Sequence, residues 1–401
     1  IRDAVVARGV PAEPGQDGFI QRLDRRDPVG VGRTMATPDA MPIPMSDIST
    51  VAKDEKIARL LPPTAGVPGK DVFGQTTTVL PGRQTMPAVG ENVAFDAHAR
   101  LFFAKSAGRV VIQENFIDIE KIMVFQGAID ISVGHVIFPG ELEIRGSVRS
   151  GLTVQAEQDI VVEGGVEAAI LKSGDGSIFI RRGVQGSGLA MVQAAWDITA
   201  KFIEQATVMA GGVLKTQSAV NSELAAGEAV LVNEGRGVVL GGRIFAGARV
   251  EVRELGGRSG GATVVQLGIT PEKLQTLAKL KTRLQVAQQA LADAETALQR
   301  FGLTGDKLQA QGLTAEGKQL LKLAKVVIVL HSRLRKIQLE EDKFLEAMKT
   351  RTDGVLEVRG RAHPGVRVLI GHATYYVTEP LTGVRFKYDP AQHRIKAMPL
   401  I

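Results

Sequence analysis

The sequence predicts a mainly β protein built on a single-stranded β-solenoid, and three observations support this prediction. Seven short apolar–variable–apolar segments recur, at 142–144, 160–162, 178–180, 198–200, 214–216, 230–232 and 250–252. Their starts lie 18, 18, 20, 16, 16 and 20 residues apart, and glycines or other turn-forming residues precede many of them. A period near 18 residues without a helical pattern is typical of a coiled β-solenoid, in which each turn of chain buries its inner face by stacking on its neighbours.

The first 120 residues are rich in proline, glycine and charge, and we expect residues 1–120 to form an N-terminal α+β recognition domain. Dense Pro and Gly over 61–74 predict consecutive tight turns, without the glycine and lysine spacing of a phosphate-binding loop. Alternating apolar residues over 85–119 predict hairpin strands. The β-solenoid is then expected over residues 121–269.

Residues 270–350 carry heptad patterns and predict an inserted antiparallel coiled-coil hairpin. Thr270, Pro271 and Glu272 form a helix start, with an N-cap hydroxyl, a proline at the first helical position and an acid in the first turn. A second set of heptads follows a glycine-containing loop at 302–314. Strands resume after Gly354, so residues 351–401 are expected to form a C-terminal β cap on the open end of the column.

The composition is that of an ordinary globular chain, with 401 residues, 44% hydrophobic and 23% charged residues, which leaves room for two or three domains. The chain has no cysteine, which excludes disulfides and thiolate metal sites and fits an expected cytoplasmic location. No apolar run approaches the roughly 20 residues of a membrane span. The first residue is Ile1 rather than methionine, so we expect that an N-terminal piece precedes it.

Most of the net charge of +6 lies on the predicted hairpin, where 14 Lys and Arg residues against 9 Asp and Glu residues give +5. Lys318, Lys322 and Lys325 are four and three residues apart, so they share one helix face. Contact with an acidic protein partner is the functional interpretation, and a solvated outer face is the alternative. The candidate partner-binding residues are Lys318, Lys322, Lys325, Arg333, Arg335 and Lys336.

No catalytic, cofactor-binding or metal-binding residue is predicted, and we expect the chain not to be an enzyme. The six histidines are scattered without metal-ligand spacing, and no βαβ unit surrounds the glycines at 235–242. Asp159, Asp175 and Asp197 precede three predicted strands, where stacked carboxylates would bind calcium or polarise a sugar. We favour the other interpretation, in which each aspartate caps a turn through backbone hydrogen bonds. Low aromatic content, 4%, argues against sugar platforms and nucleic-acid stacking.

Several stretches, in chain order, resemble the flagellar assembly protein A family. They are the Gly-Val-Pro-Ala-Glu-Pro-Gly-Gln-Asp-Gly run at 9–18, the Pro/Gly stretch at 62–74, and the segments 162–170, 199–206 and 235–243. The resemblance implies an N-terminal domain, a β-solenoid, a coiled coil and a short β tail. It also implies a bacterial, cytoplasmic, non-catalytic scaffold or adaptor for flagellar assembly or placement. Such a protein acts through protein partners of the flagellar or cell-pole machinery, without nucleic acid and without a membrane span.

Two other functions stay open on the residues alone. A polysaccharide-active or acyl-transferring β-helix enzyme would need a carboxylate cluster in a groove with raised pKa values. A self-assembling structural β-solenoid would associate through uncapped strand edges, so self-association is the third alternative.

Overall fold

The computed structural model describes residues 8–23, 49–113, 116–257, 262–300 and 315–400, and the side chains of 300 and 315–320 are not described. The chain divides into two compact units, Ile1–Ala195 and Trp196–Ile401. About seven β-solenoid turns lie within residues 122–267, and each unit contains some of these turns. The predicted mainly β solenoid fold is confirmed.

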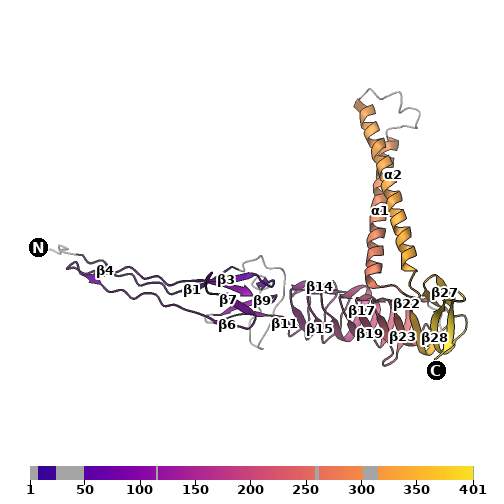
Figure 1. Ribbon diagram of the computed structural model, residues 1–401, viewed down its shortest axis with the longest axis horizontal. Helices are drawn as coiled ribbons and strands as arrows, with labels where there is room; N and C mark the ends of the chain where they lie inside the picture. The colour runs from indigo at the N-terminus through magenta and orange to yellow at the C-terminus, as the bar shows by residue number, and fades with distance from the viewer. Residues whose placement is uncertain (1–7, 24–48, 114–115, 258–261, 301–314, 401) are drawn as a thin grey trace. The chain divides into compact units, whose positions relative to one another are not determined.

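The first unit contains two small sheets around a shared apolar core (Figure 1). Ile57, Phe102 and Ile117 are fully buried in that core. One sheet has the order β1-β3-β8-β7, with β1 Phe19–Arg22, β3 Lys56–Leu61, β8 Leu101–Ala104 and β7 Val93–Asp96. The other has the order β2-β9-β10-β6, with β2 Thr50–Val51, β9 Gly108–Gln113, β10 Phe116–Glu120 and β6 Ala88–Val89.

The helical part of the expected α+β domain is not found in residues 8–23 and 49–113, where the structure has strands and turns only. The physical reason lies in the periodicity of the sequence. Buried and less buried residues alternate along β9, and other apolar residues of the described region stand among prolines and glycines. Neither pattern provides the 3.6-residue stripe that a helix needs to bury.

Three extended segments, 8–18, 62–70 and 75–83, also belong to the first unit, and we call them the stalk. Segments 8–18 and 62–70 are antiparallel, with bridges from Val10 to Lys70 and from Glu13 to Val67. The short strands β4 Gly69–Lys70 and β5 Thr76–Thr77 form a hairpin. Gly82 donates a backbone hydrogen bond to Thr64, which continues the pairing of the last two segments.

Solenoid strands of the first unit stack in parallel, and the repeat of the sequence sets their register. Met123 lies beside Leu142, Leu142 beside Ile160, and Ile160 beside Ile178. All four side chains are buried, so each turn of chain covers the apolar face of the one before. These strands are β11 Ile122–Phe125, β12 Val136–Phe138, β13 Glu141–Ile144, β14 Thr153–Ala156, β15 Ile160–Val162, β16 Ile170–Ser173 and β17 Ile178–Ala194.

The second unit continues the same pattern. Ile198 pairs with Leu214, Leu214 with Val230, and Val230 with Val250, again as buried neighbours on parallel strands. Within each unit the predicted strand segments therefore stack at equivalent positions. The strands are β18 Ile198–Ala210, β19 Val213–Thr216, β20 Ser218–Ala226, β21 Ala229–Val232, β22 Val238–Ala246, β23 Arg249–Leu255 and β24 Thr263–Leu267.

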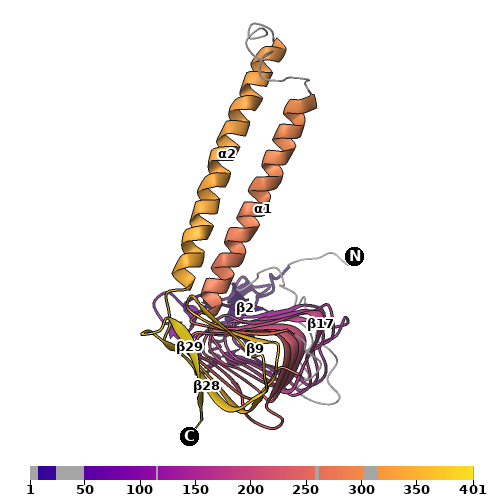
Figure 2. The same cartoon turned by 90° about the vertical axis from the view of Figure 1, so that its right-hand side faces the viewer.

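Two long helices interrupt the solenoid of the second unit: α1 Pro271–Arg300 and α2 Ala315–Met348. They lie side by side as an antiparallel pair (Figures 1 and 2), as the heptads predict. The prediction for the loop at 302–314 lies outside the described residues. After α2 the chain returns to the column, because β25 Val355–Ala362 pairs in parallel with β23, and β26 Val366–Ile370 with β24.

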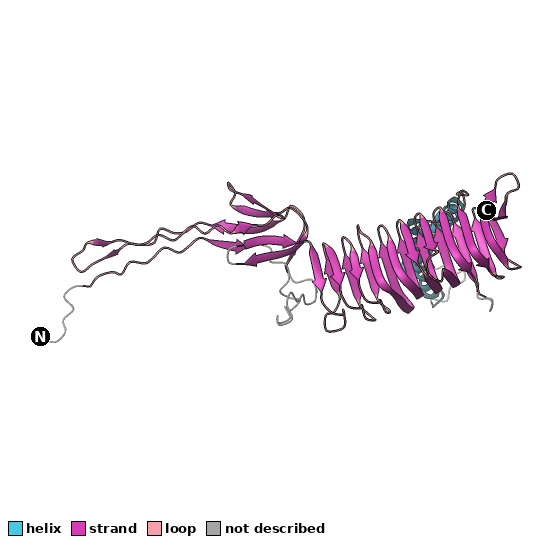
Figure 3. Ribbon diagram, turned by 90° about the horizontal axis from the view of Figure 1, so that it is seen from below, coloured by secondary structure: helices cyan, strands magenta, loops and turns pink. Residues whose placement is uncertain are grey.

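Three antiparallel strands close this end of the second unit (Figure 3). They are β27 Ala373–Tyr376, β28 Leu381–Asp389 and β29 Arg394–Pro399. Strand β27 pairs with β26, β28 with β25, and β29 with β28. The hydrogen-bonding edges of the last solenoid strands are thus covered, as expected for a C-terminal cap.

Candidate partner-binding surface

The root of the helical hairpin packs on the outer surface of the solenoid. Parallel register places Met209, Ala225 and Phe245 at equivalent positions on successive strands. The two buried members of this row, Ala225 and Phe245, form an apolar cluster with Ile269 and Met348, at the two ends of the hairpin. Leu274, Leu277 and Phe344 pack on the same cluster. The first and last turns of the hairpin are therefore attached to the column.

Heptad positions of the two helices face each other along the hairpin. Leu280, Ala287 and Leu291 of α1 and Ile337 of α2 are buried. Among the described side chains, two polar contacts join the helices: Arg283 Nη1 lies 3.5 Å from Glu340 Oε2, and His331 Nε2 lies 3.0 Å from Glu295 Oε1. Both pairs are exposed to solvent, so apolar packing contributes most of the helix–helix association.

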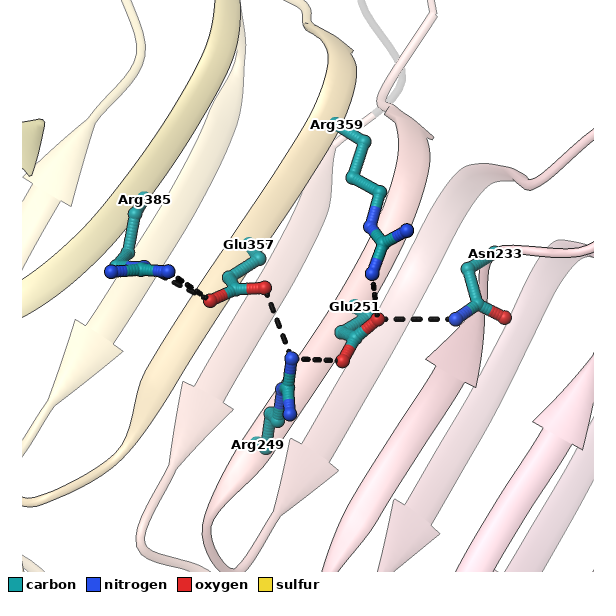
Figure 4. Close-up of polar contacts among 6 residues, drawn as sticks. All are labelled: Asn233, Arg249, Glu251, Glu357, Arg359 and Arg385. Atoms are coloured by element: carbon teal, nitrogen blue, oxygen red, sulfur yellow. Dashed lines mark hydrogen bonds and ion pairs between the residues drawn. The ribbon is translucent and has the colours of Figure 1, made fainter. Parts of the chain in front are cut away.

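A network of charged side chains links β23, which precedes the hairpin, to β25, which follows it (Figure 4). Glu251 on β23 is buried and accepts hydrogen bonds from Asn233 Nδ2 and Arg359 Nη2, each at 3.1 Å. Arg249 forms ion pairs with both Glu251 and Glu357. Glu357 on β25 in turn accepts from Arg385 of β28, with an Nε to Oε1 distance of 2.9 Å.

This network joins β23, β25 and β28, and so it spans the 108 residues that separate Arg249 from Glu357. Burial acts to raise the pKa of the Glu357 carboxyl, but hydrogen bonds and positive charge from Arg249 and Arg385 outweigh burial and lower the pKa below its ordinary value. The carboxylate is therefore ionised at neutral pH. The network holds the two ends of the hairpin insertion in register.

Four of the predicted basic residues form a continuous row on the outer surface of α2. Lys322, Lys325, Arg333 and Lys336 are exposed, and Val329, with 62% of its surface exposed, lies in the middle of the row. Successive members are three, four, four and three residues apart, a spacing that keeps them on one helix face. We call these five residues the basic face.

The other two predicted residues do not join this row. Arg335 is exposed, but it follows Ile328 by seven residues and precedes Leu339 by four, on a neighbouring and more apolar strip of the helix. The side chain of Lys318 lies outside the described residues. The structure thus brings together four of the six predicted basic residues.

A hollow between the helices borders the basic face. It has a volume of about 210 Å³. Val286, which lines it, is 63% exposed. Arg333 belongs both to the lining of the hollow and to the basic face. The residues that line it are Thr282, Arg283, Val286, Ala287, Ala290, Leu330, Arg333 and Ile337. Apolar groups and cations therefore meet on one side of the hairpin.

The central part of α2 carries no negative charge of its own. Residues 321–339 contain five Lys and Arg residues and no Asp or Glu. Among the described residues, none of these five forms an ion pair. A concentration of unpaired positive charge next to exposed Val and Ile side chains favours binding of an acidic, partly apolar surface.

Two of the three aspartates that precede solenoid strands, Asp159 and Asp197, form hydrogen bonds to the next turn of chain. Asp159 Oδ1 accepts from the backbone N–H of Ser177, and Asp197 Oδ1 accepts from that of Val213, each at 2.7 Å. These contacts favour the turn-capping interpretation over a calcium or sugar site. Within the described part of the chain, no three His, Asp or Glu side chains are arranged to hold a metal ion.

Together these features define a class of protein: a capped β-solenoid with an inserted, basic helical hairpin. Comparison with protein families agrees. The Flagellar Assembly Protein A beta solenoid domain matches residues 121–394, and the Flagellar Assembly Protein A N-terminal region matches residues 1–115. The chain belongs to the flagellar assembly protein A family. None of the curated proteins and none of the solved structures with which the chain was compared gives a match.

Neither described helix has the length and apolar composition to cross a bilayer.

Two parts of the surface were not found from the sequence. The hollow depends on how α1 and α2 pack. Glu251 and Glu357, the carboxylates of the charged network, belong to no sequence motif. The alternation of charge in Arg249-Val-Glu251 and Glu357-Val-Arg359 was the one available signal, because alternate residues of a strand share a face.

Proposed function

We propose that this member of the flagellar assembly protein A family is a cytoplasmic, non-catalytic scaffold. In this proposal the solenoid is a rigid support, and the hairpin presents the basic face to an acidic protein of the flagellar or cell-pole machinery. The observation that carries the proposal is the row Lys322, Lys325, Val329, Arg333 and Lys336, which is exposed and has no carboxylate partner among the described residues.

Physical chemistry supports a protein partner for this surface. Exposed cations attract an acidic surface over a distance of about 8–10 Å at physiological salt, which raises the rate of encounter. The adjacent hollow and Val329 then provide apolar area for a stable contact. The attachment of the hairpin through Phe245 and Met348 limits its motion, so less freedom is lost on binding.

The enzyme alternative has less support. The carboxylates of Asp159 and Asp197 are engaged with backbone N–H groups, and Glu251 and Glu357 are paired with arginines. The pKa of Glu357 is lowered, whereas a general acid needs a raised pKa. Burial and the charges of Asp159 and Glu143 raise the pKa of the Glu141 carboxyl, which favours the enzyme alternative, but the Asp159 carboxylate beside it is engaged with the turn. Self-assembly through the C-terminal end of the second unit is opposed by β27 and β28, which cover the strand edges.

The test is rescue of flagellation in cells that lack this gene. A variant with Lys322, Lys325, Arg333 and Lys336 all changed to Glu reverses the charge of the basic face. Because all four side chains are exposed, the variant is expected to fold normally, with circular dichroism and unfolding temperature as checks. It is expected to fail to restore flagellar number and swimming.

The matched control is Lys279→Glu with Lys281→Glu, which reverses two exposed charges on α1 outside the basic face. This variant is expected to rescue as well as the intact chain. Normal flagella with the reversed basic face would disprove the proposed contact. Unchanged flagella in cells that lack the gene would remove the flagellar role of this family member altogether.

A further inference from the structure

The stalk is held together by backbone contacts rather than by a side-chain core. At one level the three segments form a closed cycle of hydrogen bonds. Gly15 N–H donates to Leu80 O at 3.0 Å, Gly82 N–H to Thr64 O at 3.0 Å, and Thr64 N–H to Gln16 O at 3.0 Å. Each segment thus bonds to both of the others, which is the arrangement of a three-chain bundle rather than a flat sheet.

Glycines allow this close approach of the backbones. An added Cβ at Gly82 would lie 1.9 Å from Gln16 O, and at Gly15 it would lie 2.1 Å from Thr64 O. Small residues recur every third position at Gly9, Ala12, Gly15 and Gly18. A period of three with glycine at the crowded axis is typical of bundled polyproline II chains. The stalk is therefore a stiff element whose larger side chains point outward.

A tightly bonded turn closes the end of the stalk between β4 and β5. Asp71 Oδ1 accepts from the backbone N–H groups of Phe73 at 2.9 Å and Gln75 at 2.8 Å. Gly74 adopts a φ of 83°, and its N–H donates to Asp71 O at 3.0 Å. Asp71 N–H in turn donates to Gln75 O. Four hydrogen bonds thus fix the backbone of the tip, residues 71–75.

The tip presents an aromatic side chain that contributes nothing to the fold. Phe73 is 86% exposed, and Val72 beside it is also exposed. Single exposed apolar side chains are common, but Phe73 stands on a turn that hydrogen bonds hold in one conformation, and a tip that needed only to turn would be satisfied by a polar residue. A large apolar side chain on a preorganised backbone is the usual form of a binding anchor.

We propose that Phe73 at the tip of the stalk inserts into an apolar pocket of a partner protein, as an interaction site separate from the basic face. The local charge indicates a protein rather than a membrane. Residues 67–77 contain one Lys and one Asp, so the tip lacks the cluster of cations that attracts anionic lipid. Val72 and Phe73 also form a small apolar area, which matches a side-chain pocket better than a bilayer surface.

The test uses the full chain in its own cells, with the photoreactive residue p-benzoylphenylalanine in place of Phe73. The matched control places the same residue at Leu80, which is 80% exposed on the same stalk but away from the turn. A polypeptide cross-linked from position 73 and not from position 80 is then identified, purified and titrated against the intact chain and two variants, Phe73→Ala and Leu80→Ala.

The expected result is an adduct to another protein from position 73 alone. Its affinity should fall about 30-fold for Phe73→Ala, the loss typical of an anchor residue, and should stay unchanged for Leu80→Ala. Phe73→Tyr should keep most of the affinity, because the ring is retained. Reversal of the basic face should leave this contact intact, so the two proposed sites succeed or fail separately.

Three outcomes would overturn the proposal. Equal adducts or no adducts at both positions would show that the tip has no specific partner. Adducts to a second copy of the chain would show self-association instead. Co-sedimentation with phosphatidylglycerol vesicles that is lost in Phe73→Ala, without a protein adduct, would show that the tip binds a membrane.

Discussion

Gly227 lies in a turn between two solenoid strands, next to glycines of the turns before and after it. A Cβ added at Gly227 would lie 1.8 Å from Gly211 O, and one added at Gly247 would lie 1.8 Å from Gly227 O. Both oxygens are backbone atoms, so the backbone itself would have to shift to make room for a Cβ. These glycines set how closely successive turns of the column approach.

Gly227→Ala is therefore expected to lower the free energy of unfolding by about 3 kcal/mol or more. Gly127→Ala is the control, because an added Cβ there meets nothing within 4 Å. The control should change the free energy of unfolding by less than about 1 kcal/mol. Urea unfolding followed by circular dichroism measures both. Equal stabilities would mean that the turns adjust freely.

Glu357 provides a pH-dependent contribution to stability at the residue scale. Its lowered pKa means that the folded state favours the ionised carboxylate. The resulting contribution to the free energy of unfolding is complete above the ordinary carboxyl pKa of 4.5. It is lost as the pH falls through the lower pKa that Glu357 has in the folded state. Glu357→Gln keeps the shape of the side chain but removes the charge. It is expected to cost about 1–3 kcal/mol at pH 7.

The difference between the intact chain and Glu357→Gln should shrink as the pH falls below 4.5. Thermal unfolding at a series of pH values measures this convergence. Lys387→Gln, on the same strand β28 but outside the network, serves as a control with no expected convergence. A constant difference at all pH values would show that Glu357 acts through its shape alone.

At the scale of elements, the hairpin depends on a small apolar contact with the column. Phe245 is the largest solenoid side chain in the cluster that includes Ile269 and Met348. It points away from the inner column, since its neighbours Ile244 and Ala246 on β22 alternate with it. The hairpin root shields this side chain from water.

Phe245→Ala is expected to loosen the hairpin root while the solenoid stays folded. Truncation of a buried phenylalanine typically lowers stability by about 3–5 kcal/mol. Here the lost packing is that between the hairpin root and the column, so this contact is the part that is weakened. Hydrogen exchange should rise over residues 271–280 and 340–348 and stay unchanged over β21 to β23. Phe179→Ala, which removes an exposed ring from β17, is the control. Uniform faster exchange would contradict a local role.

At the scale of the whole molecule, the C-terminal strands determine whether this end of the column stays free of self-association. Strands β25 and β26 would present unpaired backbone groups if β27 to β29 were absent. A chain that ends at Ile370 is therefore expected to associate with increasing concentration, as light scattering would show. The intact chain should keep a constant mass over the same range. A truncated chain of constant mass would contradict a capping role.

Much of the architecture is predictable because a solenoid is a local structure in sequence. Leu142, Ile160 and Ile178 pair at intervals of one repeat, so their spacing alone predicts the stacking. The heptads of 277–298 and 320–344 likewise predict the helix pair. The basic face is partly predictable for the same reason, since Lys322, Lys325, Arg333 and Lys336 need only helical geometry to align.

What only the tertiary structure decided is where distant segments meet. The sequence by itself determined the period of the column, the apolar faces of its strands and the positive charge of α2, because each depends on residues within one or two repeats. It did not determine that β25 resumes the ladder beside β23 after the helices, that Glu251 and Glu357 share Arg249, or that Gly15 and Gly82 bring three segments together around one axis. Those contacts join residues up to 108 positions apart, and no local periodicity encodes which of many compatible surfaces will meet.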